Sequence, residues 1–146
     1  PLTINMNIGL PYVDGYYHLS IDTTTWQTLY RISGNVYADD VPVDVVRFEW
    51  ESSHYWYIGD TLGYIVQECF NCDCQYVSVD TSYITWFDGF EVPTVNGVSY
   101  SNSDGEFNTM FAPVKSMIGD TVIVWMSVDN EVNSLDLQSF IGIVLE

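Results

Sequence analysis

The chain has 146 residues, about one domain, and its 20 aspartates and glutamates against three lysines and arginines give a net charge of −17. A chain this acidic repels phosphate backbones and anionic lipid surfaces, which argues against nucleic-acid and membrane-surface binding. Its 47% hydrophobic and 16% aromatic residues suffice for a packed core and argue against disorder. No run of about 18 apolar residues predicts a membrane-spanning helix.

Strict alternation of apolar and polar residues predicts a β-strand over residues 2–10, which Pro11 ends. Five large apolar side chains fall on one face: Leu2, Ile4, Met6, Ile8 and Leu10. Their full burial would contribute on the order of 8–15 kcal/mol before ordering costs, so the strand is expected to join a sheet. That sheet is either its own or a neighbouring subunit's, and the following segment, PYVDGYY, would be the hinge for donation.

Apolar runs with strand composition continue along the chain, at residues 26–37, 44–51, 61–67, 75–80, 83–87, 121–128 and 139–146. In the second run, Val46, Phe48 and Trp50 share one face, opposite the charged side chains. Turn sequences such as VDG, ADDVP and IGD separate the runs. Residues 92–107 are expected to form a hairpin closing at Asp104-Gly105.

These strands, with no predicted helix, indicate an all-β fold. We expect an antiparallel Greek-key β-sandwich of the immunoglobulin-like or transthyretin-like kind, with an N-terminal extension strand. The expected organisation is a strand at residues 1–11 followed by a single sandwich domain at residues 12–146. No stretch with the composition of a linker divides that domain.

A pattern of small, acidic and turn-forming residues occupies residues 32–67. It consists of Gly34, Val36, Asp39, Asp40, Pro42, Asp60, Thr61, Gly63 and Tyr64. This pattern resembles the carboxypeptidase-regulatory-like and transthyretin-like modules, which are relatives of the Cna-B type. The resemblance implies a seven-stranded Greek-key sandwich, usually a non-catalytic part of an exported surface protein.

The chain departs from that family pattern at several points. It is longer than one such module, and Asp40 stands where glycine is common. Cna-B modules often carry a lysine–asparagine isopeptide, and Lys115, in APVKSM, is the one lysine available here. The strand at residues 2–10 resembles the N-terminal arms of donor-strand pilins, in pattern only.

Three cysteines lie together in the segment ECFNCDCQ: Cys69, Cys72 and Cys74. In an exported protein such a cluster favours a disulfide, and an odd number leaves one thiol over. That thiol either stays reduced or bridges to another subunit. The alternative is a metal site, in which His54 would be a remote fourth ligand.

No sequence motif predicts catalysis. Neither His18 nor His54 belongs to a G-x-S-x-G or H-E-x-x-H motif. Paired carboxylates are frequent, but no pair is marked out as the acid and base of a glycosidase. We therefore expect a protein that is not an enzyme and that requires no cofactor.

Two acidic turns are weak candidates for calcium, which prefers carboxylate, carbonyl and amide oxygens. Their residues are Asp39, Asp40 and Asp44 in the first turn and Asn102, Asp104 and Glu106 in the second. The segment NSDGE is too short for an EF-hand loop. A solvated turn is the alternative interpretation of both.

Consecutive aromatic residues occur at Tyr55, Trp56 and Tyr57. In a strand these rings would alternate between the two faces, so at least one ring is expected to point outward. Exposed rings beside acidic groups suit stacking on glycans, and equally suit a subunit interface. Trp26, Trp86 and Trp125 supply further rings.

Together these features predict an extracellular structural protein. We expect a subunit of a filament or surface appendage that polymerises head-to-tail, with strand 2–10 adding to the neighbouring subunit. The alternative is a carbohydrate-binding or adhesive module of a larger secreted protein. The start at Pro1 rather than methionine fits an exported, processed chain.

Overall fold

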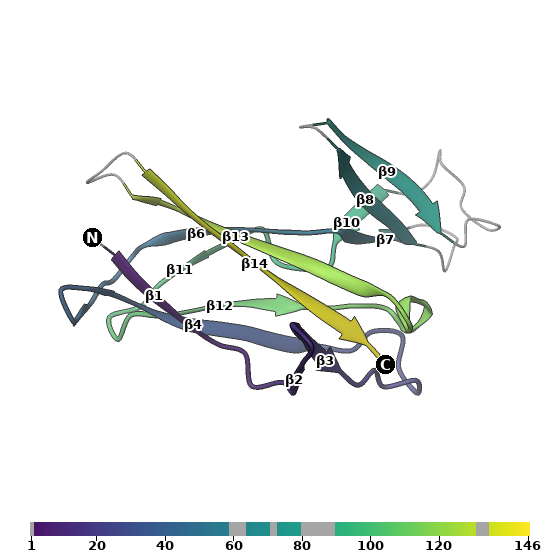
Figure 1. Ribbon diagram of the computed structural model, residues 1–146, viewed down its shortest axis with the longest axis horizontal. Helices are drawn as coiled ribbons and strands as arrows, with labels where there is room; N and C mark the ends of the chain where they lie inside the picture. Colours follow the sequence, from purple (N-terminus) through teal and green to yellow (C-terminus); the bar gives the residue numbers. More distant parts are fainter. Residues whose placement is uncertain (1, 59–63, 71–72, 80–89, 131–134) are drawn as a thin grey trace.

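The computed structural model describes residues 2–58, 64–70, 73–79, 90–130 and 135–146 (Figure 1). Their regular secondary structure consists of β-strands joined by turns and loops, with one 3₁₀ turn at Lys115–Met117, which confirms the predicted all-β fold. Among them there is no helix of the length and apolarity needed to cross a membrane. The strands are grouped into three sheets.

The first sheet has four strands. Its order is β1 (Leu2–Asn7), β4 (Tyr30–Ala38) and β12 (Glu106–Phe111), and β5 (Val41–Pro42) also pairs with β4. All of its pairs are antiparallel. Strand β1 follows the predicted alternation, because its apolar side chains are half-buried and the residues between them are exposed.

The second sheet has six strands in the order β11 (Val98–Tyr100), β6 (Arg47–Ser52), β13 (Thr121–Asn130), β14 (Leu135–Leu145), β3 (Tyr16–Leu19) and β2 (Tyr12–Val13). Pairing between β3 and β14 is parallel, an exception to the antiparallel arrangement that we expected. The orders β1-β4-β12 and β6-β13-β14 match the A-B-E and C-F-G strands of an immunoglobulin-like sandwich.

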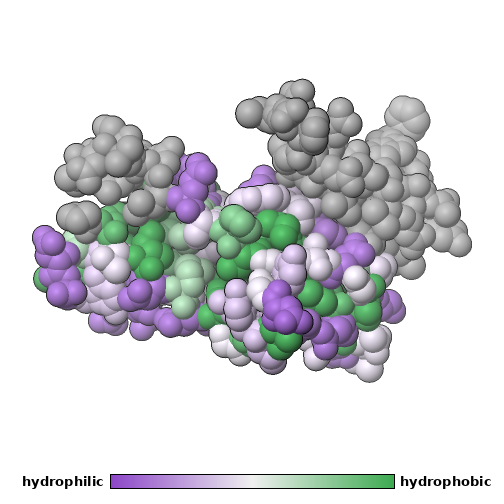
Figure 2. All heavy atoms as spheres, viewed as in Figure 1, coloured by the Kyte–Doolittle hydropathy of each residue, from purple (hydrophilic) through white to green (hydrophobic). Residues whose placement is uncertain are grey.

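The core lies between these two sheets. Its largest fully buried side chains are Phe48, Phe107, Phe111, Ile32, Met117, Ile143 and Leu145. Phe107 of the first sheet stacks on Phe48 of the second, with ring centroids 3.8 Å apart. Apolar residues also gather on the outside, where Figure 2 shows green patches between polar residues on the visible face.

The third sheet, in the order β10 (Phe90–Pro93), β7 (His54–Ile58), β8 (Tyr64–Phe70) and β9 (Asp73–Val79), projects from one end of the sandwich (Figure 1). Its strands β7 and β10 continue β6 and β11. Glu49 faces Val98 in the second sheet, whereas Tyr55 faces Pro93 in the third. Between these two pairs, the strand from β6 to β7 advances by six residues, whereas the strand from β10 to β11 advances by five. The extra residue marks a β-bulge where these strands leave the sandwich.

The prediction of a hairpin at residues 92–107 is wrong. A turn does close there, because Gly105 has φ +75° and its N–H donates to the Asn102 carbonyl at 2.9 Å. However, β11 pairs with β6 and β12 pairs with β4. The turn therefore carries the chain from one sheet of the sandwich to the other.

Candidate functional site

Two aromatic side chains belong to one cross-strand row on the outer face of the six-stranded sheet. Trp125 of β13 is paired with Glu51 of β6 on one side and with Phe140 of β14 on the other. Directly opposed residues of antiparallel strands point to the same face, so these three side chains form one row. Phe140 is 70% exposed, which brings a large apolar surface into contact with water.

A hollow of about 440 Å³ lies on one side of this row. Its lining includes Trp125 and several residues with hydrogen-bonding side chains, namely Glu49, Glu51, Ser127 and Gln138. Glu49, Ser127 and Gln138 are register partners across β6, β13 and β14 and form a polar row beside the aromatic one. An apolar wall with a few convergent polar groups is the usual composition of a ligand site.

A second hollow, of about 520 Å³, lies on the other side of the row and includes Tyr12, Asp14, Tyr16 and Phe140. Here Gly142 makes room for an aromatic ring, since a Cβ on Gly142 would lie 2.7 Å from Cδ1 of Tyr16. Tyr12 and Tyr16 are 62% and 45% exposed. The two hollows adjoin because Phe140 lines this one, while Trp125, its register partner, lines the other.

Hydrogen-bond acceptors dominate the polar groups of this face. Glu51 is oriented by two donors, the backbone N–H of Ser52 at 2.9 Å and the hydroxyl of Tyr55. Glu49 forms an exposed ion pair of 3.3 Å with Arg47. The described residues that line the two hollows include the carboxylates of Glu49, Glu51 and Asp14 and no lysine or arginine, so the face is negative overall.

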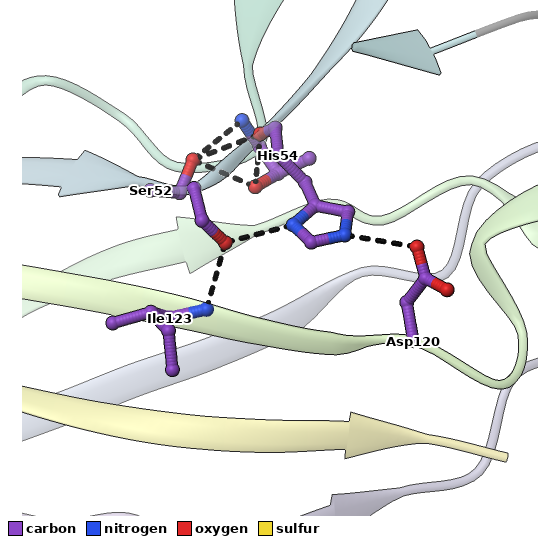
Figure 3. A network of polar contacts seen from close by, with 6 residues as sticks. Ser52, His54, Asp120 and Ile123 are labelled. Carbon is purple, nitrogen blue, oxygen red and sulfur yellow. Dashed lines mark hydrogen bonds and ion pairs between the residues drawn. The ribbon is translucent and has the colours of Figure 1, made fainter. Parts of the chain in front are cut away.

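A second polar cluster lies where β6 turns into β7 (Figure 3). Ser53 forms two hydrogen bonds with Ile123, as a residue in a regular antiparallel pair does. One of the two, however, is made by the Ser53 side chain instead of its backbone. Its backbone N–H donates to the Ile123 carbonyl at 2.8 Å, and its hydroxyl accepts from the Ile123 N–H at 2.9 Å. Because the hydroxyl replaces the Ser53 carbonyl, the backbone can turn away from β13.

The hydrogen bonds continue from Ser53 to His54 and on to Asp120, the last two of which are labelled in Figure 3. The Ser53 hydroxyl lies 2.7 Å from Nδ1 of His54, and Nε2 lies 3.0 Å from Oδ2 of Asp120. A neutral imidazole with its proton on Nε2 satisfies this chain, since Nδ1 then accepts from the hydroxyl and Nε2 donates to the carboxylate. His54 is 3% exposed.

Ser52 and Thr94 join the two chain segments that connect the third sheet to the sandwich, since Ser52 precedes β7 and Thr94 follows β10. The Thr94 hydroxyl donates to Ser52 Oγ at 2.8 Å, and Ser52 Oγ donates to the His54 carbonyl at 3.0 Å. The Thr94 N–H also donates to this carbonyl, at 3.3 Å. Both hydroxyls are fully buried, so their mutual bonds replace those lost to water.

Serine, histidine and aspartate in contact are also the residue types of a hydrolytic triad. A nucleophile must reach its substrate, yet Ser53 is 5% exposed and lines neither of the two hollows. Its oxygen is already engaged by the Ile123 N–H. We therefore assign this cluster to holding the bend between β6 and β7, and we take the outer face of the six-stranded sheet as the candidate site.

The cluster makes stability depend on pH. Burial lowers the pKa of His54 below its usual 6.5, and the Asp120 carboxylate offsets part of this effect. Below about pH 6.5 the unfolded chain gains a proton on this residue that the folded chain does not, so the free energy of unfolding falls as the pH drops. The expected loss between pH 7 and 5 is up to about 1.4 kcal/mol per pH unit.

Urea unfolding of the wild type and of His54→Gln at pH 7.5, 6 and 5 measures this loss. The variant has no imidazole at position 54 and should show the shallower pH dependence. The acidic residues and His18 are common to both proteins, so the difference between the two curves isolates His54. Identical pH dependence would contradict the assignment.

The predicted interface residues of strand 2–10 lie in the chain's own sandwich. Leu2, Ile4, Met6 and Leu10 are half-buried and pack against the core. Ile8, just beyond the end of β1, is 4% exposed. Their contact with a neighbouring subunit stays a prediction.

The two turns proposed for calcium have clear backbone roles. Asp39 and Asp40, with φ +50° and +65°, form a two-residue turn between β4 and β5, and Asp44 is exposed beyond it. In the other turn, Oδ1 of Asn102 accepts from the backbone N–H groups two and four residues later. The described residues include no group of three His, Cys, Asp or Glu side chains placed to hold a metal. Calcium binding stays a prediction.

The register of the third sheet bears on the cysteines. Cys69 of β8 lies directly opposite Cys74 of β9, a position compatible with a local disulfide. The side chains of both residues, and Cys72 as a whole, lie outside the described part of the chain. Disulfide, intersubunit bridge and metal therefore stay open.

The expected stacking site at Tyr55, Trp56 and Tyr57 needs correction at its first member. Tyr55 is 9% exposed and its hydroxyl donates to Glu51, so its ring offers no surface to a ligand. The side chains of Trp56 and Tyr57 lie outside the described residues. Among the described side chains, the exposed rings belong to other segments.

Sequence reasoning named Trp125 as a further ring but missed Phe140, Tyr12 and Tyr16. The signal for Phe140 was available, since alternation within SFIGIVLE places it opposite Ile141 and Ile143, which face the core. Its pairing with Trp125 was not predictable. It depends on the register between β13 and β14.

No family model matches the chain, and no curated protein matches it either. The resemblance of residues 32–67 to carboxypeptidase-regulatory-like and transthyretin-like modules therefore stays a prediction. Function must be argued from the geometry of the site, because a sandwich fold by itself hosts many functions.

Proposed function

We propose that this chain is a carbohydrate-binding, adhesive module of an exported protein, and that it binds saccharides on the outer face of its six-stranded sheet. The observation that carries the proposal is the aromatic pair of half-buried Trp125 and exposed Phe140 between two hollows. This pair supplies flat apolar surface where an ordinary sandwich presents polar residues to water.

The chemistry of the face suits a sugar ring. A pyranose has a C–H face that packs on an aromatic ring, and hydroxyls at its edge that donate hydrogen bonds. Glu49, Glu51, Ser127 and Gln138 provide acceptors beside Trp125. A site that combines apolar surface with several fixed acceptors distinguishes a polyhydroxylated ligand from a purely apolar one.

Charge narrows the class of saccharide. With a net charge of −17 and carboxylates on the face, the module repels sulfated and uronic-acid polymers. Neutral polysaccharides experience no such repulsion. We therefore propose an uncharged glycan as the ligand.

Isothermal titration calorimetry against neutral and anionic oligosaccharides tests this proposal. We expect binding to at least one neutral oligosaccharide of glucose, mannose, xylose or N-acetylglucosamine units, and none to heparin or alginate fragments. Trp125→Ala should weaken binding at least tenfold, because such anchors carry much of the binding energy. Failure of all neutral ligands to bind would contradict the proposal.

Trp26→Ala is the matched control. Trp26 is 43% exposed but lines neither hollow. Its removal should change the affinity by less than about twofold, within the ordinary effect of a substitution outside an interface. Equal losses in the two variants would show that the ring of Trp125 is not a specific contact.

A filament subunit remains the second candidate, favoured by the position of β1 at the end of its sheet. Strand donation would require β1 to leave β4, because β1 occupies its own sheet. The chain after β1 is also held, since the Tyr30 hydroxyl donates to the Ile8 carbonyl. An exchange would therefore have to re-form these contacts with a neighbouring copy.

A further inference from the structure

The free edge of β1 differs from the other edges of the sandwich. Strand β1 has six residues and pairs with β4 alone. The outer strands of the six-stranded sheet, β11 and β2, have three and two residues. On one side of β1, backbone N–H and C=O groups therefore point outward without a strand partner among the described residues.

The opposite edge of the same sheet is covered. Strand β12 borders the segment around Val95, which forms a bridge with Phe111. The Ala112 N–H donates to the Thr94 carbonyl at 2.7 Å, and the Met110 N–H donates to Oδ1 of Asn96 at 3.1 Å. A neighbouring copy therefore cannot extend the sheet at β12 without displacing this segment.

Strand β1 also lacks the features that normally protect an edge. Natural edges carry charges, prolines or bulges that prevent pairing with another chain. β1 pairs with β4 in unbroken register, and its solvent face carries Thr3, Asn5 and Asn7. No charged side chain occurs between residues 2 and 13, although the whole chain carries −17. This is therefore a place where two copies can approach with little charge repulsion.

We infer that two copies of this chain pair through their β1 strands, antiparallel to each other about a two-fold axis. Such an axis keeps each side chain on its own face of the joined sheet. The pair is therefore centred on Ile4 or on Asn5, and the apolar side chains of both copies meet on the core side. One strand from each copy buries little area, so the dimer is weak. It strengthens with salt, because salt screens the long-range repulsion between two chains that each carry −17.

Sedimentation velocity up to about 1 mM protein, in 20 and 500 mM NaCl, tests the inference. We expect a monomer–dimer equilibrium that shifts several-fold toward dimer at high salt. Asn5→Lys should weaken dimerisation at least tenfold, because it places like charges across the junction. Hydrogen exchange should show extra protection of the β1 amides in the dimer.

Asn108→Lys is the matched control, because Asn108 is also an exposed asparagine, on β12 at the other edge of the same sheet. It adds the same charge and should leave dimerisation unchanged. Purely monomeric wild type in high salt, or equal behaviour of the two variants, would overturn the inference. Assemblies larger than a dimer would also overturn it, in favour of strand donation.

Discussion

Replacing Phe107 by alanine is expected to lower the free energy of unfolding by about 3–5 kcal/mol, the usual cost of removing a buried phenylalanine. Phe107 is 1% exposed and joins the two sheets of the sandwich. Its ring stacks on Phe48 at an interplanar angle of 15° and lies 6.1 Å from the Trp50 ring. The alanine variant would lose these contacts and leave a cavity between the sheets.

Urea denaturation of Phe107→Ala beside Phe140→Ala measures this effect. The chemical change is the same, but Phe140 is 70% exposed, so its variant should unfold within about 0.5 kcal/mol of the wild type. A loss below about 1.5 kcal/mol for Phe107→Ala would show that the core tolerates the cavity. The Phe140 variant also serves the saccharide titrations, because it should weaken binding while remaining folded.

Gly34→Ala is expected to cost about 2–3 kcal/mol, at the upper end of ordinary overpacking. A Cβ at this position would lie 2.6 Å from the carbonyl oxygen of Asn5 and 2.6 Å from Cζ of Phe107. The first of these atoms is backbone and cannot rotate away. The methyl group would therefore push β1 off β4 or tilt the central ring of the core.

Gly97→Ala provides the control for Gly34→Ala, since a Cβ on Gly97 meets no atom within 4 Å. Its midpoint of urea unfolding should stay close to that of the wild type. Hydrogen exchange locates the damage, and the Gly34 variant should lose protection in residues 2–7 first. Unchanged exchange in β1 would mean that the ring, not the strand, absorbs the clash.

Periodicity predicted the faces of individual strands well. In β6, Phe48 and Trp50 are buried while Arg47, Glu49 and Glu51 are exposed, as the alternation indicates. Strand β1 shows the same agreement. Alternation succeeds here because each strand lies between the core and water, and that environment acts on every second residue.

Features that depend on which strands become neighbours were not accessible in this way. The bond between His54 and Asp120 joins residues 66 positions apart. The aromatic row depends on the register of three strands, and the parallel pairing of β3 with β14 follows from the path of the whole chain. The failed hairpin at residues 92–107 has the same cause, because a turn sequence fixes local direction but not the destination of its strands.

The buried hydroxyls at the junction of the sandwich and the third sheet have a consequence for how this molecule can vary. Ser52 and Thr94 touch, so the chain leaves the sandwich and returns to it at one point. Residues 54–93 are therefore an insertion with adjoining ends. Beyond His54, which helps to hold the bend, such an insertion can be lengthened, shortened or exchanged while the strands that build the core keep their order. This junction therefore suits the grafting of other loops onto the scaffold.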